Sequence, residues 1–199
     1  KSVHIALLYA LEGLAVNTDP YVIDGHADKR KTFKSIILRL VNSENLASFK
    51  ANITRSGNIP VQQAFKTYTS KRQQYEYLRA LGLKATEPSK PLSINKGFIN
   101  YIPSGATGDE LLTLVMDRHH LIAHYFGTKN IGLKLQRLDS DLMANTLDKL
   151  KGIPCLPVHD SIRCKVSDME RVSNAMIDSF RELHGQEIIV TNDLSYQKG

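Results

Sequence analysis

The sequence lacks the features of a membrane protein and of a disulfide-stapled one. No apolar run approaches the roughly 18 residues that cross a bilayer, and no segment resembles a secretory signal. Its 199 residues include only two cysteines, Cys155 and Cys164. Both lie in strand-like segments and suit small buried hydrophobic positions better than a disulfide framework. We therefore expect a folded protein of a reducing, cytoplasmic compartment, with no membrane partner.

The start of the chain also lacks an initiator Met and lies inside an apolar pattern, Lys1-Ser-Val-His-Ile-Ala-Leu-Leu8. This start is typical of an excised or processed piece. We expect the chain to be part of a longer parent chain.

The positive charge is unevenly distributed. Between Lys29 and Lys90 there are thirteen Lys or Arg against three Glu, a net charge of +10, which leaves −4 for the rest of the total of +6. Such a stretch can attract a polyanion such as a nucleic acid, or it can be a solvated helical surface. Aromatic side chains interleave with these cations and could stack on bases or pack in a core: Phe33, Phe49, Phe65, Tyr68, Tyr75 and Tyr77.

Apolar spacing predicts four helices before the C-terminal region. They cover residues 2–14, 29–49, 109–126 and 133–150. Asp28 is the expected N-cap of the second helix, and Asp109 and Gly127 are the expected start and stop of the third. Two other stretches carry weaker patterns: residues 57–81 are basic and partly helical, and residues 82–108 are rich in Pro and Gly and predict a loop or extended excursion.

The last fifty residues predict a strand, a turn, a second strand, a helix and a third strand. The strands cover residues 153–158, 161–166 and 187–191, and the turn carries His159 and Asp160. A capping box at Ser167–Glu170 is expected to open the helix, which ends near Gly185. The predicted fold is α+β, a small antiparallel sheet with packed helices and a helix-rich second subdomain. The expected divisions are residues 1–20, 21–127 and 128–199.

Asp160 is a candidate metal ligand because two strands would hold its carboxylate in a fixed place at a sheet edge. Magnesium prefers one or two carboxylates together with water and substrate phosphates, and two-metal phosphoryl-transfer sites need carboxylates from different segments. The alternative is structural, since Asp is a favoured turn residue whose side chain bonds backbone amides.

Arg30 and Lys34 are candidate anion-binding residues. Residues four apart lie on one side of a helix, and this side also carries Ile37 and Val41. Burying cations without a partner is costly. A nucleoside triphosphate would satisfy the pair, and an internal salt bridge is the alternative.

These motifs resemble those of the family A DNA polymerases and the phage-type single-subunit RNA polymerases. Leu156-Pro-Val-His-Asp-Ser-Ile162 resembles their third palm motif. Arg30-Lys-Thr-Phe-Lys34 resembles the pair on the fingers helix that grips the triphosphate. Leu135-Gln136-Arg-Leu-Asp139 is similar to a palm segment whose Gln contacts the primer–template minor groove.

The resemblance implies a palm carrying the His-Asp-Ser hairpin and helical fingers over residues 21–127. It implies a template-directed nucleotidyltransferase, a DNA polymerase of the phage or plasmid replication type. Asp160 would bind one of two magnesium ions, with His159 near the end of the growing strand. Arg30 and Lys34 would bind the nucleotide, and Gln136 the primer–template.

The sequence departs from the family at three places. His4 stands where the DNA polymerases usually carry Glu, and the other metal-binding Asp would lie about two positions before Lys1. Asn42-Ser43 replaces the family's Tyr-Gly or Phe-Gly, which influences sugar discrimination. The resemblance therefore does not imply a sugar preference or a template type.

Three other interpretations stay open. One is a non-catalytic nucleic-acid-binding module on a polymerase-like fold. Another is a metal phosphohydrolase with His-Asp on a helix, which Pro154 and Pro157 disfavour. The last is a zinc site, which lacks a nearby Cys or a completing Glu and is less favoured than helix-surface histidines; it would use His119, His120 and His124.

Overall fold

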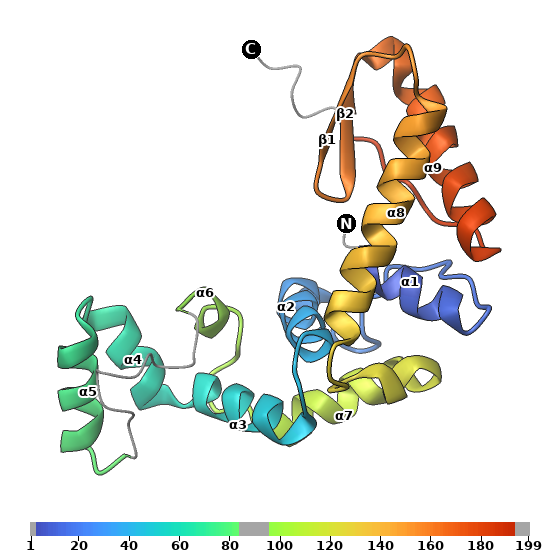
Figure 1. Ribbon diagram of the computed structural model, residues 1–199. Helices are drawn as coiled ribbons and strands as arrows, with labels where there is room; N and C mark the ends of the chain where they lie inside the picture. Colours follow the sequence, from blue (N-terminus) through green and yellow to red (C-terminus); the bar gives the residue numbers. More distant parts are fainter. Residues whose placement is uncertain (1–2, 84–95, 194–199) are drawn as a thin grey trace. The chain divides into compact units, whose positions relative to one another are not determined.

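The computed structural model describes residues 3–83 and 96–193. The described residues form helices and one two-stranded antiparallel sheet (Figure 1), which confirms the predicted α+β class. The chain divides into two compact units. Unit 1 consists of Lys1–Pro20 and Asn130–Gly199, and unit 2 consists of Tyr21–Lys129. The sequence predicted divisions after residues 20 and 127.

Unit 1 is built on two long helices that pack along each other, α8 (Ile131–Lys149) and α9 (Met169–His184). Helix α1 (His4–Leu11) packs against both. Lys149 Nζ on α8 donates a hydrogen bond of 2.6 Å to Glu182 Oε2 on α9. These helices bury an apolar stripe each, formed by Ile5, Leu7, Leu8, Leu135, Leu142, Val172, Ala175 and Phe180.

Helix α9 ends at Gly185, as the sequence predicts. Gly185 adopts φ 69°, a left-handed conformation that costs least without a Cβ. Its N–H donates to the carbonyl oxygen of Arg181 at 2.8 Å. Beyond it, Gln186 Nε2 donates to the carbonyl oxygen of Gly13, which ties the chain after α9 to the loop after α1.

The sheet of unit 1 is the predicted hairpin, with strands β1 (Cys155–Val158) and β2 (Ser161–Cys164). Its strands are shorter than the expected ranges. One face of the hairpin packs against a cluster whose buried members are Leu150, Val172 and Ala175. The hairpin side chains that pack there are Cys155, Ile162 and Cys164.

Every regular secondary-structure element in the described part of unit 2 is a helix. Its first long helices are α2 (Arg30–Val41) and α3 (Leu46–Gly57), and α3 packs against α7 (Gly108–Arg118). The backbones of α3 and α7 approach closely: a Cβ added to Gly108 would lie 2.4 Å from the carbonyl oxygen of Lys50. Only glycine fits that contact without a shift.

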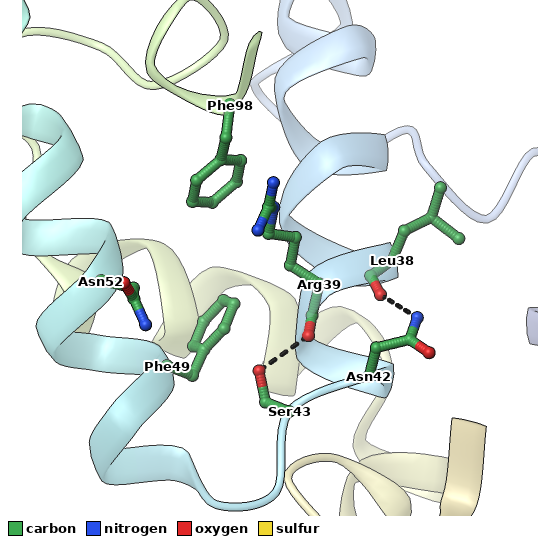
Figure 2. Close-up of a pocket in the computed structure, with 7 residues that line it drawn as sticks. All are labelled: Leu38, Arg39, Asn42, Ser43, Phe49, Asn52 and Phe98. Atoms are coloured by element: carbon green, nitrogen blue, oxygen red, sulfur yellow. Dashed lines mark hydrogen bonds between the residues drawn. The ribbon is translucent and has the colours of Figure 1, made fainter. Parts of the chain in front are cut away.

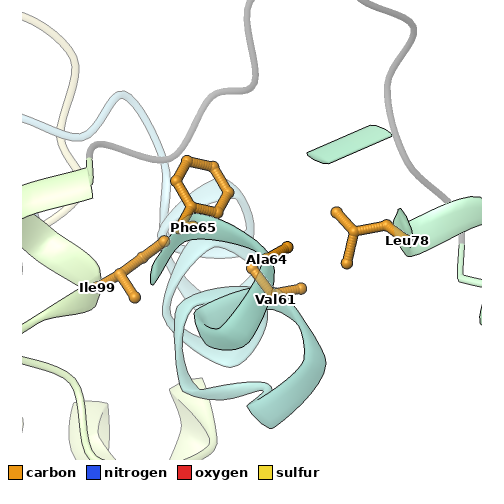
Figure 3. Packing of buried hydrophobic residues seen from close by; sticks show 5 residues of the cluster. All are labelled: Val61, Ala64, Phe65, Leu78 and Ile99. Atoms are coloured by element: carbon orange, nitrogen blue, oxygen red, sulfur yellow. The ribbon is translucent and has the colours of Figure 1, made fainter. Parts of the chain in front are cut away.

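The remaining helices of unit 2 form a small lobe, α4 (Ile59–Thr67), α5 (Lys71–Ala80) and α6 (Lys96–Ile99). Figure 3 shows the apolar side chains that join them, from α4, from α5 and from α6. The buried Gln62 fixes the chain after α6, because its Nε2 donates to the carbonyl oxygen of Ile102 at 2.9 Å. The cluster consists of Val61, Ala64, Phe65, Leu78 and Ile99.

The single helix predicted over residues 29–49 is wrong. Two helices replace it, because the side chains of Asn42 and Ser43 bond to the last carbonyls of α2, those of Leu38 and Arg39. Asn45 then caps α3 by accepting from the N–H of Ser48 at 2.8 Å.

The predicted N-cap Asp28 is also wrong. It lies in a 3₁₀ turn, Ala27–Lys29, and the N-cap of α2 is Lys29. The chain therefore enters α2 through a 3₁₀ turn rather than through a capping carboxylate.

The expected start of the third helix at Asp109 is displaced. Thr107 is the N-cap of α7, in a capping box with Glu110. The helix also stops at Arg118, and a 3₁₀ turn, His120–Tyr125, covers most of the predicted remainder. Gly127 follows with φ 66°, as a stop residue should.

Two predictions after the hairpin are wrong. Ser167 lies in a 3₁₀ turn, Val166–Asp168, and no side chain caps α9. Residues 187–191 are not a strand, and no other segment among the described residues forms a β-ladder with them. A strand needs a partner for its backbone groups, and local alternation does not supply one.

The other expected elements agree with the structure apart from their ends. Residues 57–81 contain α4 and α5, residues 133–150 lie almost wholly in α8, and the first predicted helix is α1. The excursion at residues 82–108 contains the short helix α6, and its residues 84–95 lie outside the described part. Within the described part, no helix combines the length and the apolar character needed to span a bilayer.

Candidate functional site

The His159–Asp160 turn joins β1 to β2 directly. Val158 pairs with Ser161, so the two residues between them make the whole connection. His159 adopts φ 54°, a left-handed conformation that costs a non-glycine residue about 1 kcal/mol. Ser161 Oγ closes the turn by donating to the carbonyl oxygen of Val158 at 2.8 Å. The two strands therefore hold the backbone of the half-buried Asp160 in a defined position.

A second carboxylate, that of Asp139 on α8, lies within electrostatic reach of Asp160. Burial raises the pKa of Asp139, the nearby His4 lowers it, and the charge of Asp160 raises it further. The side chain of Asp139 is 26% exposed, and its Oδ2 lies 3.8 Å from His4 Nε2 on α1. Two carboxylates and an imidazole from three separate elements therefore share one region of unit 1.

No role was expected for Asp139 from the sequence, although its helical spacing contains a signal. Asp139 follows the buried Leu135 by four residues and precedes the buried Leu142 by three, so it lies on the inward stripe of α8. A carboxylate on a buried stripe needs a partner or a function. Gln136, the predicted nucleic-acid contact, is exposed on α8, and its role stays a prediction.

Two cations of unit 2 lie over one aromatic ring. Arg30 Cζ is 5.5 Å and Lys34 Nζ is 5.6 Å from the centroid of the Tyr21 ring, which is fully buried. Both side chains are half-buried, on the side of α2 that carries the buried Ile37 and Val41.

The Tyr21 ring partly offsets the burial of these cations. A cation over an aromatic ring gains about 0.5–1 kcal/mol when exposed and about 2 kcal/mol when desolvated. Like charges four apart on a helix oppose each other by about 0.2–0.5 kcal/mol. Within the described ranges Lys34 forms no ion pair with a carboxylate, so the salt bridge considered for it from the sequence is not seen there. An anion bound between Arg30 and Lys34 would relieve their repulsion.

A pocket of about 320 Å³ opens beside the C-terminal end of α2 (Figure 2). The guanidinium of Arg39 lies over the ring of Phe98, 4.4 Å from its centroid. Burial lowers the pKa of Arg39. Asn42 and Ser43, where the sequence departs from the motif that it resembles, line this pocket. Both side chains also donate hydrogen bonds to carbonyl oxygens of α2. The lining residues are Leu38, Arg39, Asn42, Ser43, Phe49, Asn52 and Phe98.

The aromatic residues of the basic stretch mostly pack in the core. Phe33, Phe49, Phe65 and Tyr75 are each at most 7% exposed. Tyr68 and Tyr77 pack against each other with their ring centroids 5.4 Å apart. Stacking on bases is therefore not supported for the four buried rings. The basic side chains of the α4–α5 region are exposed: Lys66, Lys71, Arg72 and Arg79.

The three histidines considered for zinc do not form a site. His119 is 1% exposed and its ring meets Phe126 edge-on at 6.1 Å. His120 and His124 lie on the exposed side of a 3₁₀ turn rather than one turn apart on an α-helix. Among the residues that the structure describes, no group of three or more His, Cys, Asp or Glu side chains could hold a metal ion.

The predicted site residues thus fall into two groups, in different units. Asp160 and His159 belong to unit 1, where the structure adds Asp139 and His4 to them. Arg30 and Lys34 belong to unit 2. Comparisons of the chain with protein-family models, with curated proteins and with solved structures found no match.

Proposed function

We propose that this chain is the catalytic part of a template-directed nucleotidyltransferase of the DNA polymerase type. The observation that carries the proposal is the position of Asp160, at the two-residue turn of a hairpin and within electrostatic reach of Asp139. A carboxylate on such a rigid element, with a second one within electrostatic reach, has the donor chemistry that magnesium prefers.

Asp160 is the residue that would hold magnesium, with Asp139 as a nearby second carboxylate. Burial is the main cause of the raised pKa of Asp139, and the charge of Asp160 adds to it; a divalent cation would relieve this added repulsion. When bound, magnesium would neutralise phosphate charge and lower the pKa of an attacking hydroxyl. Asp160 would hold the ion from its place in the turn. The exposed His159 would contact the end of the growing strand.

Arg30 and Lys34 would bind the nucleoside triphosphate. Both are cations half-buried on one side of α2, steadied by the ring of Tyr21. Charge-assisted hydrogen bonds to phosphate are stronger than neutral ones. Because these residues are already positioned, they could stabilise triphosphate charge as it shifts during transfer.

The exposed cations of unit 2 would hold the nucleic-acid backbone. The stretch from Lys29 to Lys90 has a net charge of +10, and Lys66, Lys71 and Arg79 are exposed on α4 and α5. Contacts of this kind bind phosphate without reading sequence. We therefore expect binding that weakens steeply with added salt.

The experiment is an incorporation assay with the intact protein, a primed template, magnesium and the four deoxynucleoside or ribonucleoside triphosphates. The proposal predicts template-dependent chain extension with release of pyrophosphate. Extension must stop when magnesium is chelated or when template is left out. Release of phosphate from nucleotides without any extension would contradict it, and would favour a phosphohydrolase.

The structure gives little support to that phosphohydrolase. Its His-Asp pair should lie on a helix, whereas His159 and Asp160 lie in a hairpin turn.

The second candidate is a non-catalytic nucleic-acid-binding module, which the basic surface of unit 2 favours. Salt-sensitive binding of the primed template together with no incorporation of either nucleotide class would select this candidate.

A further inference from the structure

Cys155 and Cys164 lie opposite each other across the hairpin as a register pair of β1 and β2. Both are free thiols and both are half-buried. Directly opposed residues of an antiparallel pair project to the same face of the sheet. Here that face is the one that packs against the Leu150, Val172 and Ala175 cluster.

The type of pair favours a bond between the two sulfurs. Hydrogen-bonded and non-hydrogen-bonded pairs alternate along an antiparallel ladder. Counting from Val158 and Ser161, which flank the two-residue turn, the cysteines form the fourth pair, a non-hydrogen-bonded one. Pro157 belongs to the second pair, of the same type, where the ladder requires no N–H from it.

The backbone separation at such a pair matches that of a disulfide. Non-hydrogen-bonded pairs have Cα atoms about 4.5 Å apart, and disulfides join Cα atoms about 4.4–6.8 Å apart. Neither strand would have to slip or shift register for the bond to form. From the sequence, both cysteines were expected only to fill small hydrophobic positions.

We propose that Cys155 and Cys164 are a modification site, a thiol pair that a small disulfide such as oxidised glutathione converts to a reversible cross-strand disulfide. One protein thiolate attacks the glutathione disulfide and releases one glutathione thiolate. The other protein thiolate then attacks the mixed disulfide and releases the second. Two protein thiols are oxidised to one disulfide, and one glutathione disulfide is reduced to two thiols. The two protons that the protein thiols lose go to solvent or to the two glutathione thiolates.

Burial, with the nearby Asp168 and Cys155, raises the pKa of the Cys164 thiol, so less of it is thiolate at neutral pH. The exchange is therefore expected to be faster at mildly alkaline pH, whichever of the two thiols attacks first. The bond closes the hairpin at the end opposite the His159–Asp160 turn. This inference does not depend on the proposed polymerase function.

The test is intact-mass analysis of the folded protein after incubation with oxidised glutathione at mildly alkaline pH. The expected product has lost two hydrogens, carries no glutathione and returns to the starting mass with dithiothreitol. Peptide mapping should place the bond between Cys155 and Cys164. The Cys155→Ser variant is the matched control and should stop at a single glutathione adduct on Cys164.

Three results would overturn the proposal: an unchanged wild-type mass, stable glutathione adducts on both cysteines, or covalent dimers in place of the internal bond. Amide hydrogen exchange gives a readout that needs no variant. Exchange of the β1 and β2 amides should slow severalfold in the oxidised protein, because the bond restricts the open states. Faster exchange would show that the bond strains the hairpin and would contradict the matched geometry.

Discussion

Asp139 on α8 and Asp160 in the hairpin turn interact electrostatically although twenty residues, including the whole of β1, lie between them in the chain. The charge of Asp160 raises the pKa of Asp139, in addition to the larger effect of burial, while His4 opposes both. The fold therefore keeps two carboxylates near each other at an energetic cost. Groups perturbed in this way concentrate at functional sites.

The raised pKa of Asp139 gives a pH-dependent prediction. Above about pH 4 the unfolded chain has lost this proton while the native state still tends to hold it. Wild-type stability should therefore fall as pH rises through this window. Asp139→Asn removes the effect, so its free energy of unfolding should match wild type near pH 3.5 and exceed it near pH 7.

Urea unfolding at a series of pH values would measure this difference. Asp141→Asn is the matched control, because Asp141 is exposed on the same helix and pairs with the exposed Arg137. Its difference from wild type should not vary with pH in the same way. A loss of stability by Asp139→Asn that grows as pH rises would contradict the assignment.

The cation pair of α2 predicts a nucleotide-affinity defect. Arg30→Ala or Lys34→Ala should raise the KM for nucleoside triphosphate about 10–100-fold, the equivalent of losing one hydrogen bond to a charged group, about 1.5–3 kcal/mol. Lys31→Ala is the control, since Lys31 is exposed on the same helix. Steady-state kinetics would measure the KM of each variant. An equal rise in KM for the Lys31 and Lys34 substitutions would count against a specific site.

The capping box of α7 predicts a stability difference between two threonines. Thr107 Oγ1 accepts from the N–H of Glu110, so Thr107→Ala should destabilise the protein by about 1 kcal/mol. Thr113 lies within the helix and bonds back to the carbonyl oxygen of Asp109. Thr113→Ala should be neutral or slightly stabilising, because alanine has the higher helix propensity. Similar melting temperatures for both variants would contradict this interpretation of the cap.

The close approach of α3 and α7 predicts that a substitution at Gly108 destabilises the protein. Gly108→Ala would place a Cβ 2.4 Å from the backbone oxygen of Lys50. Backbone cannot rotate away as a side chain can, so we expect a loss of about 1–3 kcal/mol. Ala51→Ser, exposed on α3, should change the free energy of unfolding by less than about 0.5 kcal/mol. Denaturant unfolding of both variants measures the contrast, and a near-neutral Gly108→Ala would show that the helices can separate freely.

The hairpin and the long helices α8 and α9 could be predicted from the sequence because their apolar periods are strong and local. Helix starts were less predictable. Thr107 and Ser167 each begin the same Ser/Thr-x-x-Glu pattern, yet only the first is a capping box. A 3₁₀ turn occupies the second, and local sequence alone does not distinguish the two outcomes.

The candidate site shows the same limit. The turn position of Asp160 follows from the strands on either side of it, which are adjacent in the chain. The nearness of Asp139 and His4 depends on how α1 and α8 pack, which no spacing in the sequence expresses. The ring of Tyr21 under Arg30 and Lys34 is likewise a tertiary contact, made from outside α2.

Extension of a primed template by the Asp160→Asn variant tests the central claim most directly. The substitution keeps the size of the side chain and its place in the turn while removing the charge. We predict a fall in the extension rate of at least about a hundredfold, with template affinity and melting temperature close to wild type, and wild-type extension by Asp141→Asn. Undiminished extension by Asp160→Asn would contradict the role given to that carboxylate and the function built on it.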